Sequence, residues 1–185
     1  MKLVDKLDKF SAINLVDYGQ IDYSESSESK FILGAKKLKK VLEEIKDDYY
    51  VLQIKNQRIF KHTNEYYDTQ DYQLYMAYHN GSGSRYLIKN NEIEGVKGQS
   101  IEIKYQSNKG EISKVKQKVK STDISEFVQE NTPFSLEALI KTLKNKFYRI
   151  VLVHKKNREK ITIDLDLKLS TKKTKLNFLM LQLSK

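Results

Sequence analysis

Charged residues alternate with other residues along the stretch from 79 to 120, HNGSGSRYLIKNNEIEGVKGQSIEIKYQSNKGEISKVKQKVK. The pattern predicts three short strands joined by turns. Because successive side chains of a strand point to opposite faces, each strand has one polar face. These faces hold Arg85, Lys89 and Asn91 with Leu87 among them, then Glu102 and Lys104, then Lys114, Lys116, Lys118 and Lys120. If the three faces point the same way, they form a wall of cations around one carboxylate, which suits a bound polyanion with or without a metal ion.

The composition is that of a basic protein with enough apolar residues to fold. Of 185 residues, 39% are hydrophobic, which favours a folded chain over a disordered one. The formal net charge of +10 attracts nucleic acid, anionic lipid or phosphorylated ligands without selecting among them. Cysteine is absent, which excludes disulfides, zinc–thiolate sites and cysteine nucleophiles. The three histidines lie far apart, so a histidine-based metal site is not expected.

Targeting signals are not evident. No apolar run has the length that a membrane span needs, and Lys and Asp interrupt the N-terminal residues too often for a signal peptide. We therefore expect a cytoplasmic protein without a transmembrane segment.

The elements that must position the charged strands alternate between helices and strands. Ahead of them we expect a short helix and a loop in residues 1–28, a strand at 29–33, a helix at 35–48, strands at 49–54 and 58–69, and a short helix at 71–79. After them we expect helices at 121–131, capped by Ser121 or Thr122, and at 135–146, then a hairpin of strands 147–156 and 159–170, and a final strand at 176–185. No repeat or linker separates these segments, so we expect one α+β domain over residues 1–185 with about eight mostly antiparallel strands. Strands that are half charged and half apolar can pack as a closed barrel with a polar interior and helices outside.

Four blocks, in this order and at these separations, resemble a known family: SKFILGAKKL, NEYYDTQDYQLYMAYHNGSGSRYLIKN, SIEIKYQSNKGEISKVKQKV and EKITIDLDLKL. They are similar to the VTC domain, the polyphosphate polymerase domain of the vacuolar transporter chaperone complex and its bacterial relatives, in the CYTH-like triphosphate tunnel superfamily. The resemblance implies an antiparallel β-barrel with helices packed outside and an Arg- and Lys-lined bore. That bore would hold ATP, triphosphate or inorganic polyphosphate together with Mn²⁺ or Mg²⁺. The family's C-terminal helix is not expected here.

Matching the motifs residue by residue implies which side chains do the chemistry. The resemblance makes Lys89, Lys104 and Lys156 catalytic, Glu102 a metal ligand, and Lys30, Arg85, Lys114, Lys116, His154 and Lys160 substrate-binding. The implied reaction moves the γ-phosphate of ATP onto a growing polyphosphate chain, for which positioning and charge neutralisation matter most. The chain departs from the family pattern at Leu87 and Asn91, where the family is basic, at His154 in place of a tyrosine, and at Gln182 in place of a glutamate. Because Gln182 brings no charge, the affinity for a metal ion should fall.

Other functions remain open. The changes at Asn91 and Gln182 favour a noncatalytic module that binds polyanions. Triphosphate hydrolysis is a third hypothesis. Nucleic-acid binding is disfavoured, because the aromatic residues do not interleave with the basic ones as stacking platforms require. The sequence does not indicate an oligomeric state.

Individual residues also have structural interpretations. The lysine run could be a solvated edge strand, Glu102 could form an ordinary salt bridge, and His154 could make a structural hydrogen bond. Asp164 and Asp166 should share a face and balance cations rather than bind metal. The tyrosines Tyr66, Tyr67 and Tyr72 are expected to pack in the core and at the barrel rim.

Overall fold

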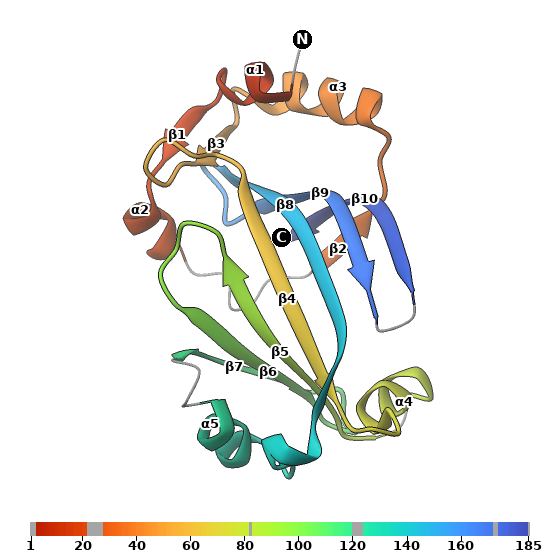
Figure 1. The fold of residues 1–185 in the computed structure, drawn as a ribbon. Coiled ribbons are helices and arrows are strands. Elements are labelled where there is room, and N and C mark those ends of the chain that lie inside the picture. The colour runs from red at the N-terminus through yellow and green to blue at the C-terminus, as the bar shows by residue number, and fades with distance from the viewer. Residues whose placement is uncertain (1–2, 22–27, 82, 120–123, 172–173, 185) are drawn as a thin grey trace. The chain divides into compact units, whose positions relative to one another are not determined.

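The computed structural model describes residues 3–21, 28–81, 83–119, 124–171 and 174–184 (Figure 1). The chain divides into two compact units. Unit 1 comprises Met1–Lys61, Phe147–Leu167 and Asn177–Lys185, and unit 2 comprises His62–Lys146 and Lys168–Leu176. The strands β4 (Phe60–Asp68), β8 (Ile140–His154), β9 (Lys160–Ser170) and β10 (Lys175–Ser184) have residues in both units. The expectation of a single domain stays a prediction.

Unit 1 opens with three short elements, which are α1 (Leu3–Leu7), β1 (Ser11–Ile13) and α2 (Leu15–Gly19). They are followed by β2 (Glu28–Phe31), α3 (Ala35–Ile45) and β3 (Tyr49–Leu52). The strand order here is β2-β10-β9-β8; β3 pairs antiparallel to β8, and β1 pairs parallel to β3. The core packs helix residues Leu38 and Leu42 against strand residues that include Val51, Ile150 and Leu152.

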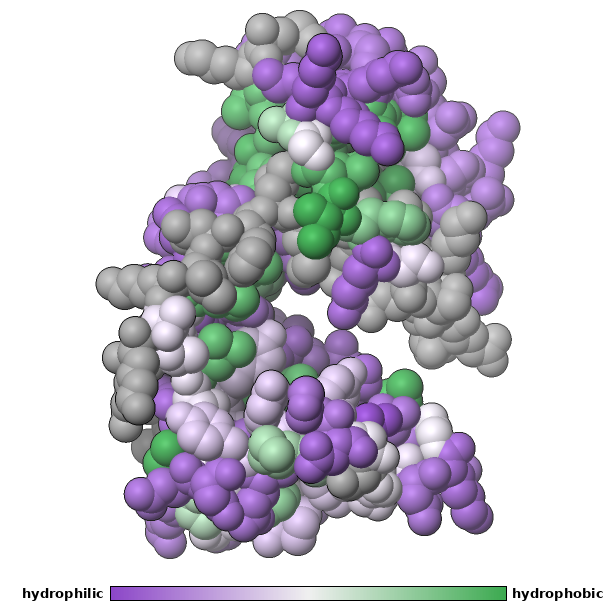
Figure 2. All heavy atoms as spheres, turned by 90° about the vertical axis from the view of Figure 1, so that its right-hand side faces the viewer, coloured by the Kyte–Doolittle hydropathy of each residue, from purple (hydrophilic) through white to green (hydrophobic). Residues whose placement is uncertain are grey.

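Helix α3 is held by this packing rather than by its ends. Leu38 and Leu42 lie one turn apart and are buried, and burying a leucine side chain contributes roughly 1.5–3 kcal/mol. Its lysine-rich start opposes the helix dipole. The outer face, with Lys36 and Lys40, is exposed, and Figure 2 shows hydrophilic side chains over this part at the top of the view.

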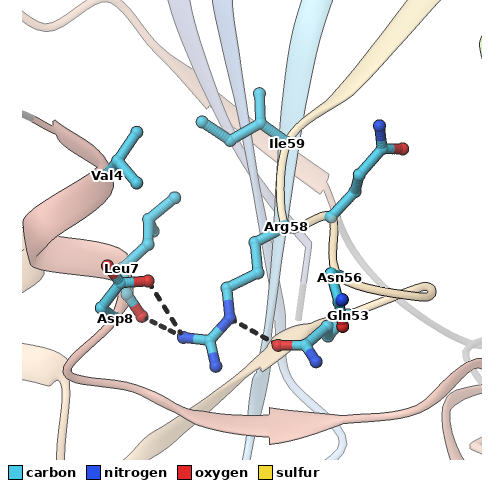
Figure 3. A pocket seen from close by; sticks show the side chains of 8 residues that line it. Val4, Leu7, Asp8, Gln53, Asn56, Arg58 and Ile59 are labelled. Carbon is cyan, nitrogen blue, oxygen red and sulfur yellow. Dashed lines mark hydrogen bonds and ion pairs between the residues drawn. The ribbon is translucent and has the colours of Figure 1, made fainter.

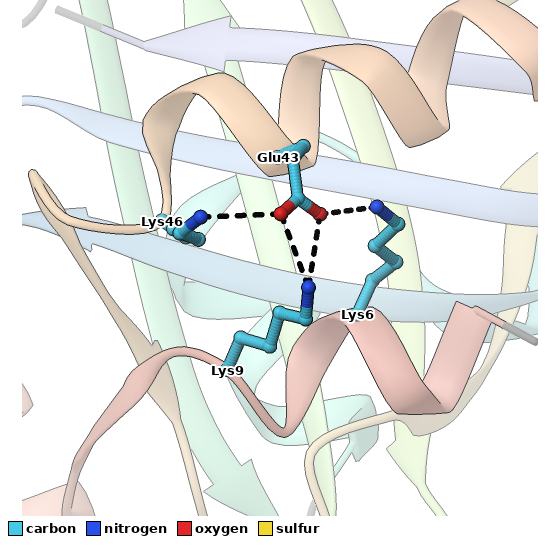
Figure 4. Close-up of polar contacts among 4 residues, drawn as sticks. All are labelled: Lys6, Lys9, Glu43 and Lys46. Carbon is cyan, nitrogen blue, oxygen red and sulfur yellow. Dashed lines mark hydrogen bonds and ion pairs between the residues drawn. The ribbon is translucent and has the colours of Figure 1, made fainter. Parts of the chain in front are cut away.

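Two polar clusters tie α1 to the rest of unit 1. Glu43 of α3 binds Lys6 and accepts from Lys9 and Lys46 at 3.1 Å each (Figure 4). The hydrogen bond from Lys6, followed by those from Lys9 and Lys46, lowers the pKa of Glu43 to about 2. On the other side of α1, Arg58 lies in a cavity of about 350 Å³ (Figure 3). It donates to the carbonyl of Leu7 at 2.6 Å and to Gln53 Oε1 at 2.7 Å, so it closes the β3–β4 turn onto α1.

Unit 2 is a meander with two helices. Its further elements are α4 (Gln73–His79), β5 (Arg85–Ile93), β6 (Gln99–Gln106), β7 (Ile112–Val119), α5 (Ile124–Asn131) and a 3₁₀ turn, η1 (Leu136–Ala138). The order is β8-β4-β5-β6-β7, with β4 to β7 antiparallel neighbours. One face of the sheet, through Ile88, Ile101 and Ile103, packs on Phe127 and Val128 of α5. The opposite face is thereby left for polar side chains.

Several sequence predictions need correction. The predicted helix at 135–146 is wrong, because only Leu136–Ala138 turns and Ile140 begins β8. The described residues form ten strands rather than about eight, and β1 is the one that has no counterpart among the predicted segments. Strand β8 also begins earlier than predicted. The proposed caps Ser121 and Thr122, and Lys120, lie outside the described residues. The other predicted strands and helices are confirmed to within a few residues at their ends.

Candidate functional site

The strand register of unit 2 puts its charged side chains on one face. Lys89 lies directly opposite Glu102, and Glu102 lies directly opposite Lys116. One step along, Lys104 lies between Leu87 and Lys114. Directly opposite residues of antiparallel strands project from the same face. The predicted alignment of the three strands is therefore confirmed. We call this set the charged face: Arg85, Leu87, Lys89, Asn91, Ser100, Glu102, Lys104, Lys114, Lys116 and Lys118.

Glu102 is the centre of the charged face. It is 7% exposed, and its two oxygens take different partners. Lys89 Nζ lies 2.8 Å from Oε1, and Lys114 Nζ lies 3.3 Å from Oε2. Burial raises the pKa of Glu102, but the charges and hydrogen bonds of Lys89 and Lys114 outweigh burial, and the net pKa is lowered. Glu102 is therefore ionised at neutral pH and fixes the position of two ammonium groups.

The lysines of the charged face outnumber this carboxylate. Desolvation lowers the pKa of Lys116; Glu102 opposes the shift, and Lys114, Lys89 and Lys118 add to it. Strand β7 ends the strand order, and the described lysines on it are exposed. The described lysines of β7 therefore do lie on an edge strand, as their structural interpretation holds. Lys114 in addition forms an ion pair with Glu102. A bound polyanion would relieve the mutual repulsion of these cations.

Asn91 lies in a neutral cluster at one end of the charged face. Its amide donates to Asn64 Oδ1, and its nitrogen lies 3.5 Å from His62 Nδ1. Asn64 and His62 are both buried. The neutral Asn91, where the resemblance implies a basic residue, is thus accommodated by amide and imidazole partners on β4, and Asn91 itself supplies no cation.

Arg85 stands at the start of β5, at the opposite end of the charged face. Its guanidinium lies 5.0 Å from the centre of the Tyr78 ring and 3.5 Å from the Tyr78 carbonyl. Its Nε is buried and has no hydrogen-bond partner within the described part of the chain. An anion is the natural partner for such a donor.

The predicted residues of unit 1 are spread over three elements. Lys30 is exposed on β2 and lies opposite Gln182 in the register with β10. Lys160 is half-buried at the start of β9. Lys156 is exposed and lies in the β8–β9 turn rather than on a strand. His154 Nδ1 accepts from the backbone N–H groups of Lys156 and Asn157 at 3.0 Å each, which favours its structural interpretation.

Unit 1 contains a further ion pair that the sequence did not predict. Arg149 makes a bidentate contact with Asp164, Nε to Oδ1 at 2.6 Å and Nη2 to Oδ2 at 2.7 Å. Asp164 is 2% exposed, and it balances a cation as expected. Asp166, however, does not share its face: its φ of 51° breaks the alternation, and it is exposed. The available signal for the pair was an arginine on one strand of the predicted hairpin and two aspartates, Asp164 and Asp166, on the other.

The described residues do not fit a preformed metal centre. Within them no group of three His, Cys, Asp or Glu side chains comes together. The carboxylate of Glu102 already has a lysine at each oxygen. Metal sites for Mg²⁺ and similar ions need several oxygen ligands. The expected Mn²⁺ or Mg²⁺ therefore stays a prediction.

Among the helices in the described ranges, none has the length and apolar character that crossing a bilayer requires.

This chain resembles known proteins both in sequence and in fold. A model of the VTC domain family matches residues 25–147. No curated protein matches the sequence. Solved structures share the fold at low identity. A candidate adenylate cyclase from Bacillus halodurans aligns at a TM-score of 0.56 and 11% identity, over 85% of this chain and 79% of its own.

Two further structures agree with it. A candidate adenylate cyclase from Vibrio parahaemolyticus aligns at a TM-score of 0.53 and 11% identity, over 86% of this chain and 74% of its own. A candidate adenylyl cyclase from Hippeastrum, described as having a dominant triphosphatase activity, aligns at 0.52 and 7% identity, over 86% and 78%. These likenesses confirm the predicted α+β, CYTH-like fold class.

Proposed function

This chain belongs to the VTC domain family, whose model matches residues 25–147, and from that premise we propose that it is an ATP-dependent polyphosphate polymerase. The observation that supports the proposal most is the row Lys89–Glu102–Lys116 in the charged face of unit 2. A surplus of fixed cations around one ionised carboxylate is suited to a chain of phosphates.

The proposed roles follow from the contacts. Glu102 holds the ammonium groups of Lys89 and Lys114 in place, and Lys104 lies between Leu87 and Lys114 in the neighbouring row. In the reaction, a terminal oxygen of the polyphosphate acceptor attacks the γ-phosphorus of ATP. The new P–O bond forms as the bond to the β,γ-bridging oxygen breaks, and ADP leaves with that electron pair. The lysines neutralise the phosphate oxygens throughout, so no protein nucleophile is needed.

The other residues that the family motif indicates have supporting roles in this proposal. Arg85 offers its unpartnered Nε to a phosphate. Lys30, Lys156 and Lys160 of unit 1 are proposed to contact further phosphates of the chain. No step is assigned to a metal ion, because Glu102 is already held by two lysines. The cytoplasm is the proposed location.

The test is a product analysis. The protein is incubated with ATP and short-chain polyphosphate, with and without Mn²⁺, and both long polyphosphate and orthophosphate are measured. We expect polymer, and we expect Lys104→Ala to slow its formation about 10²–10³-fold, the usual effect of removing one charge-stabilising donor. Lys36→Ala, on the exposed face of α3, removes the same charge and should leave the rate unchanged. A Lys104→Ala rate equal to that of Lys36→Ala would remove Lys104 from the mechanism.

A noncatalytic polyphosphate-binding module is the second candidate, and Asn91 favours it. Its amide is engaged by Asn64 and lies beside His62, so one family cation is replaced by a neutral cluster. In that case neither polymer nor orthophosphate forms, while polyphosphate raises the melting temperature. Orthophosphate without polymer would instead indicate a triphosphate hydrolase, the activity described for the Hippeastrum protein.

A further inference from the structure

A cavity of about 620 Å³ lies in unit 2, where β4 ends and β5 begins. Its volume is within the range of small-molecule sites. Its walls include the rings of Tyr66, Tyr72, Tyr75 and Tyr78 and the side chain of Leu87. From the sequence, Tyr66 and Tyr72 are expected to pack in the core and at the barrel rim. Yet Tyr72 is 51% exposed, and Tyr75 and Tyr78 are each 58% exposed.

The aromatic wall is anchored rather than loose. Asp68 accepts from the backbone N–H groups of Leu74 and Tyr75, both at 2.9 Å, and so fixes the start of α4. The Tyr75 ring stacks on His79 with ring centres 5.8 Å apart. Arg85 lies over the Tyr78 ring. Exposed aromatic rings on a fixed helix offer flat surfaces on which a planar ring can stack.

One buried polar atom of a residue that lines the cavity lacks a partner. Asn145 lines the cavity and donates through Nδ2 to the Tyr66 hydroxyl at 3.3 Å. Its Oδ1 is buried and accepts no hydrogen bond from the described residues. A buried acceptor without a partner is unfavourable, and a donor from a ligand would satisfy it. The cavity therefore suits a planar ring that carries an N–H donor.

The cavity also joins the charged face. Tyr66 lies directly opposite Lys89, and Leu87 lies directly opposite Lys104. A ligand with its ring among the tyrosines would have these lysines next to it. The chemistry that matches both regions is an aromatic base joined to a short chain of phosphates.

We propose that this cavity binds the base of a nucleoside triphosphate and selects bases that carry an exocyclic amino group. The amino group donates to Asn145 Oδ1, the ring stacks on the tyrosines of α4, and the phosphates extend over Lys89 and Lys104. The inference rests on the proposed phosphate binding at the charged face. It adds a reason why ATP, rather than any triphosphate, is the donor, because the 6-oxo group of inosine would set oxygen against oxygen at Asn145.

The test is titration calorimetry with ATP, ITP and inorganic tripolyphosphate. The unaltered protein should bind ATP about tenfold more tightly than either ITP or tripolyphosphate, the order expected for one stacked and hydrogen-bonded base. Tyr75→Ala should weaken ATP binding about tenfold and change tripolyphosphate binding less than about twofold. Asn145→Leu should abolish the preference for ATP over ITP. Tyr148→Ala removes an exposed tyrosine of unit 1 that does not line the cavity, and it should change nothing.

The outcomes separate the two proposals. Equal affinity of the unaltered protein for ATP, ITP and tripolyphosphate would overturn the base site while leaving phosphate binding intact. An equal loss of ATP and tripolyphosphate affinity in Tyr75→Ala would do the same. If tripolyphosphate does not bind the unaltered protein at all, the charged face is not a phosphate site, and the base site fails with it.

Discussion

Glu102 shows how a single carboxylate can organise a cationic surface. Its oxygens orient Lys89 and Lys114, and its own pKa is lowered because those ion pairs outweigh its burial. The sequence suggested a choice between a metal ligand and an ordinary salt bridge. The contacts show the salt bridge, formed with Lys89 and Lys114, and in our proposal this salt bridge positions the lysines that would meet the phosphates.

This role makes a pH-dependent prediction. Glu102→Gln should lower the free energy of unfolding by about 2 kcal/mol at neutral pH, the order for hydrogen bonds to a charged group. Because the folded-state pKa is lowered, the ionised carboxylate stabilises the fold above the ordinary glutamate pKa of about 4.3. That stabilisation is lost as the pH falls below this value toward the lowered pKa. Urea unfolding of both proteins from pH 7 to pH 3 measures the difference.

The matched control is Glu44→Gln. Glu44 is exposed on α3, and its contact with Lys40 is long, at 3.8 Å. The free energy of unfolding of Glu44→Gln should therefore change by no more than about 0.5 kcal/mol. A difference for Glu102→Gln that is as large at pH 3 as at pH 7 would contradict the assignment.

Asp164 leads to a prediction about stability alone. Asp164→Asn would leave Arg149 without its bidentate partner in a largely buried position, and we expect a loss of about 3 kcal/mol. Asp47→Asn makes the same change at an exposed position after α3 and should be nearly neutral. Denaturant midpoints compare the two variants, and similar losses would show that Arg149 is not held by Asp164.

At the scale of elements, α4 connects the fold to the cavity. Asp68 is buried, and its two oxygens accept from the amides of Leu74 and Tyr75. Asp68→Ala should destabilise the protein by about 1–2 kcal/mol, as the loss of a helix cap does. Amide hydrogen exchange should speed up in Gln73–His79 and stay unchanged in α5. Uniform acceleration over both helices would mean that Asp68 supports the whole unit rather than α4.

The sequence correctly predicted the strands that have one apolar face and one charged face. Alternation located β5, β6 and β7, because apolar residues such as Ile88 and Ile101 must reach the core while Lys89 and Glu102 must not. It failed at 135–146, where Leu136, Leu139, Ile140 and Leu143 have helical spacing. There, pairing with β4 decides the outcome, and a single sequence does not show that partner. The φ of Asp166 and the partners of Asn91 are likewise set by tertiary contacts.

At the scale of the whole molecule, the residues that the family motif indicates belong to two units. The charged face lies in unit 2, whereas Lys30, His154, Lys156 and Lys160 lie in unit 1. The charged face alone already has the surplus of cations that a phosphate chain needs. We therefore propose that unit 2 provides the main part of phosphate binding.

Tripolyphosphate affinity tests this central claim most directly. The double variant Lys104→Ala with Lys116→Ala removes two cations from the charged face, and Lys36→Ala with Lys37→Ala removes two from the exposed face of α3. Both variants have the same net charge, so a general electrostatic effect would be equal. We predict about a hundredfold weaker binding for the first variant, as expected for two charge-assisted hydrogen bonds, and no more than about a twofold change for the second. Equal affinities for the two variants would contradict the claim that the charged face is the phosphate site.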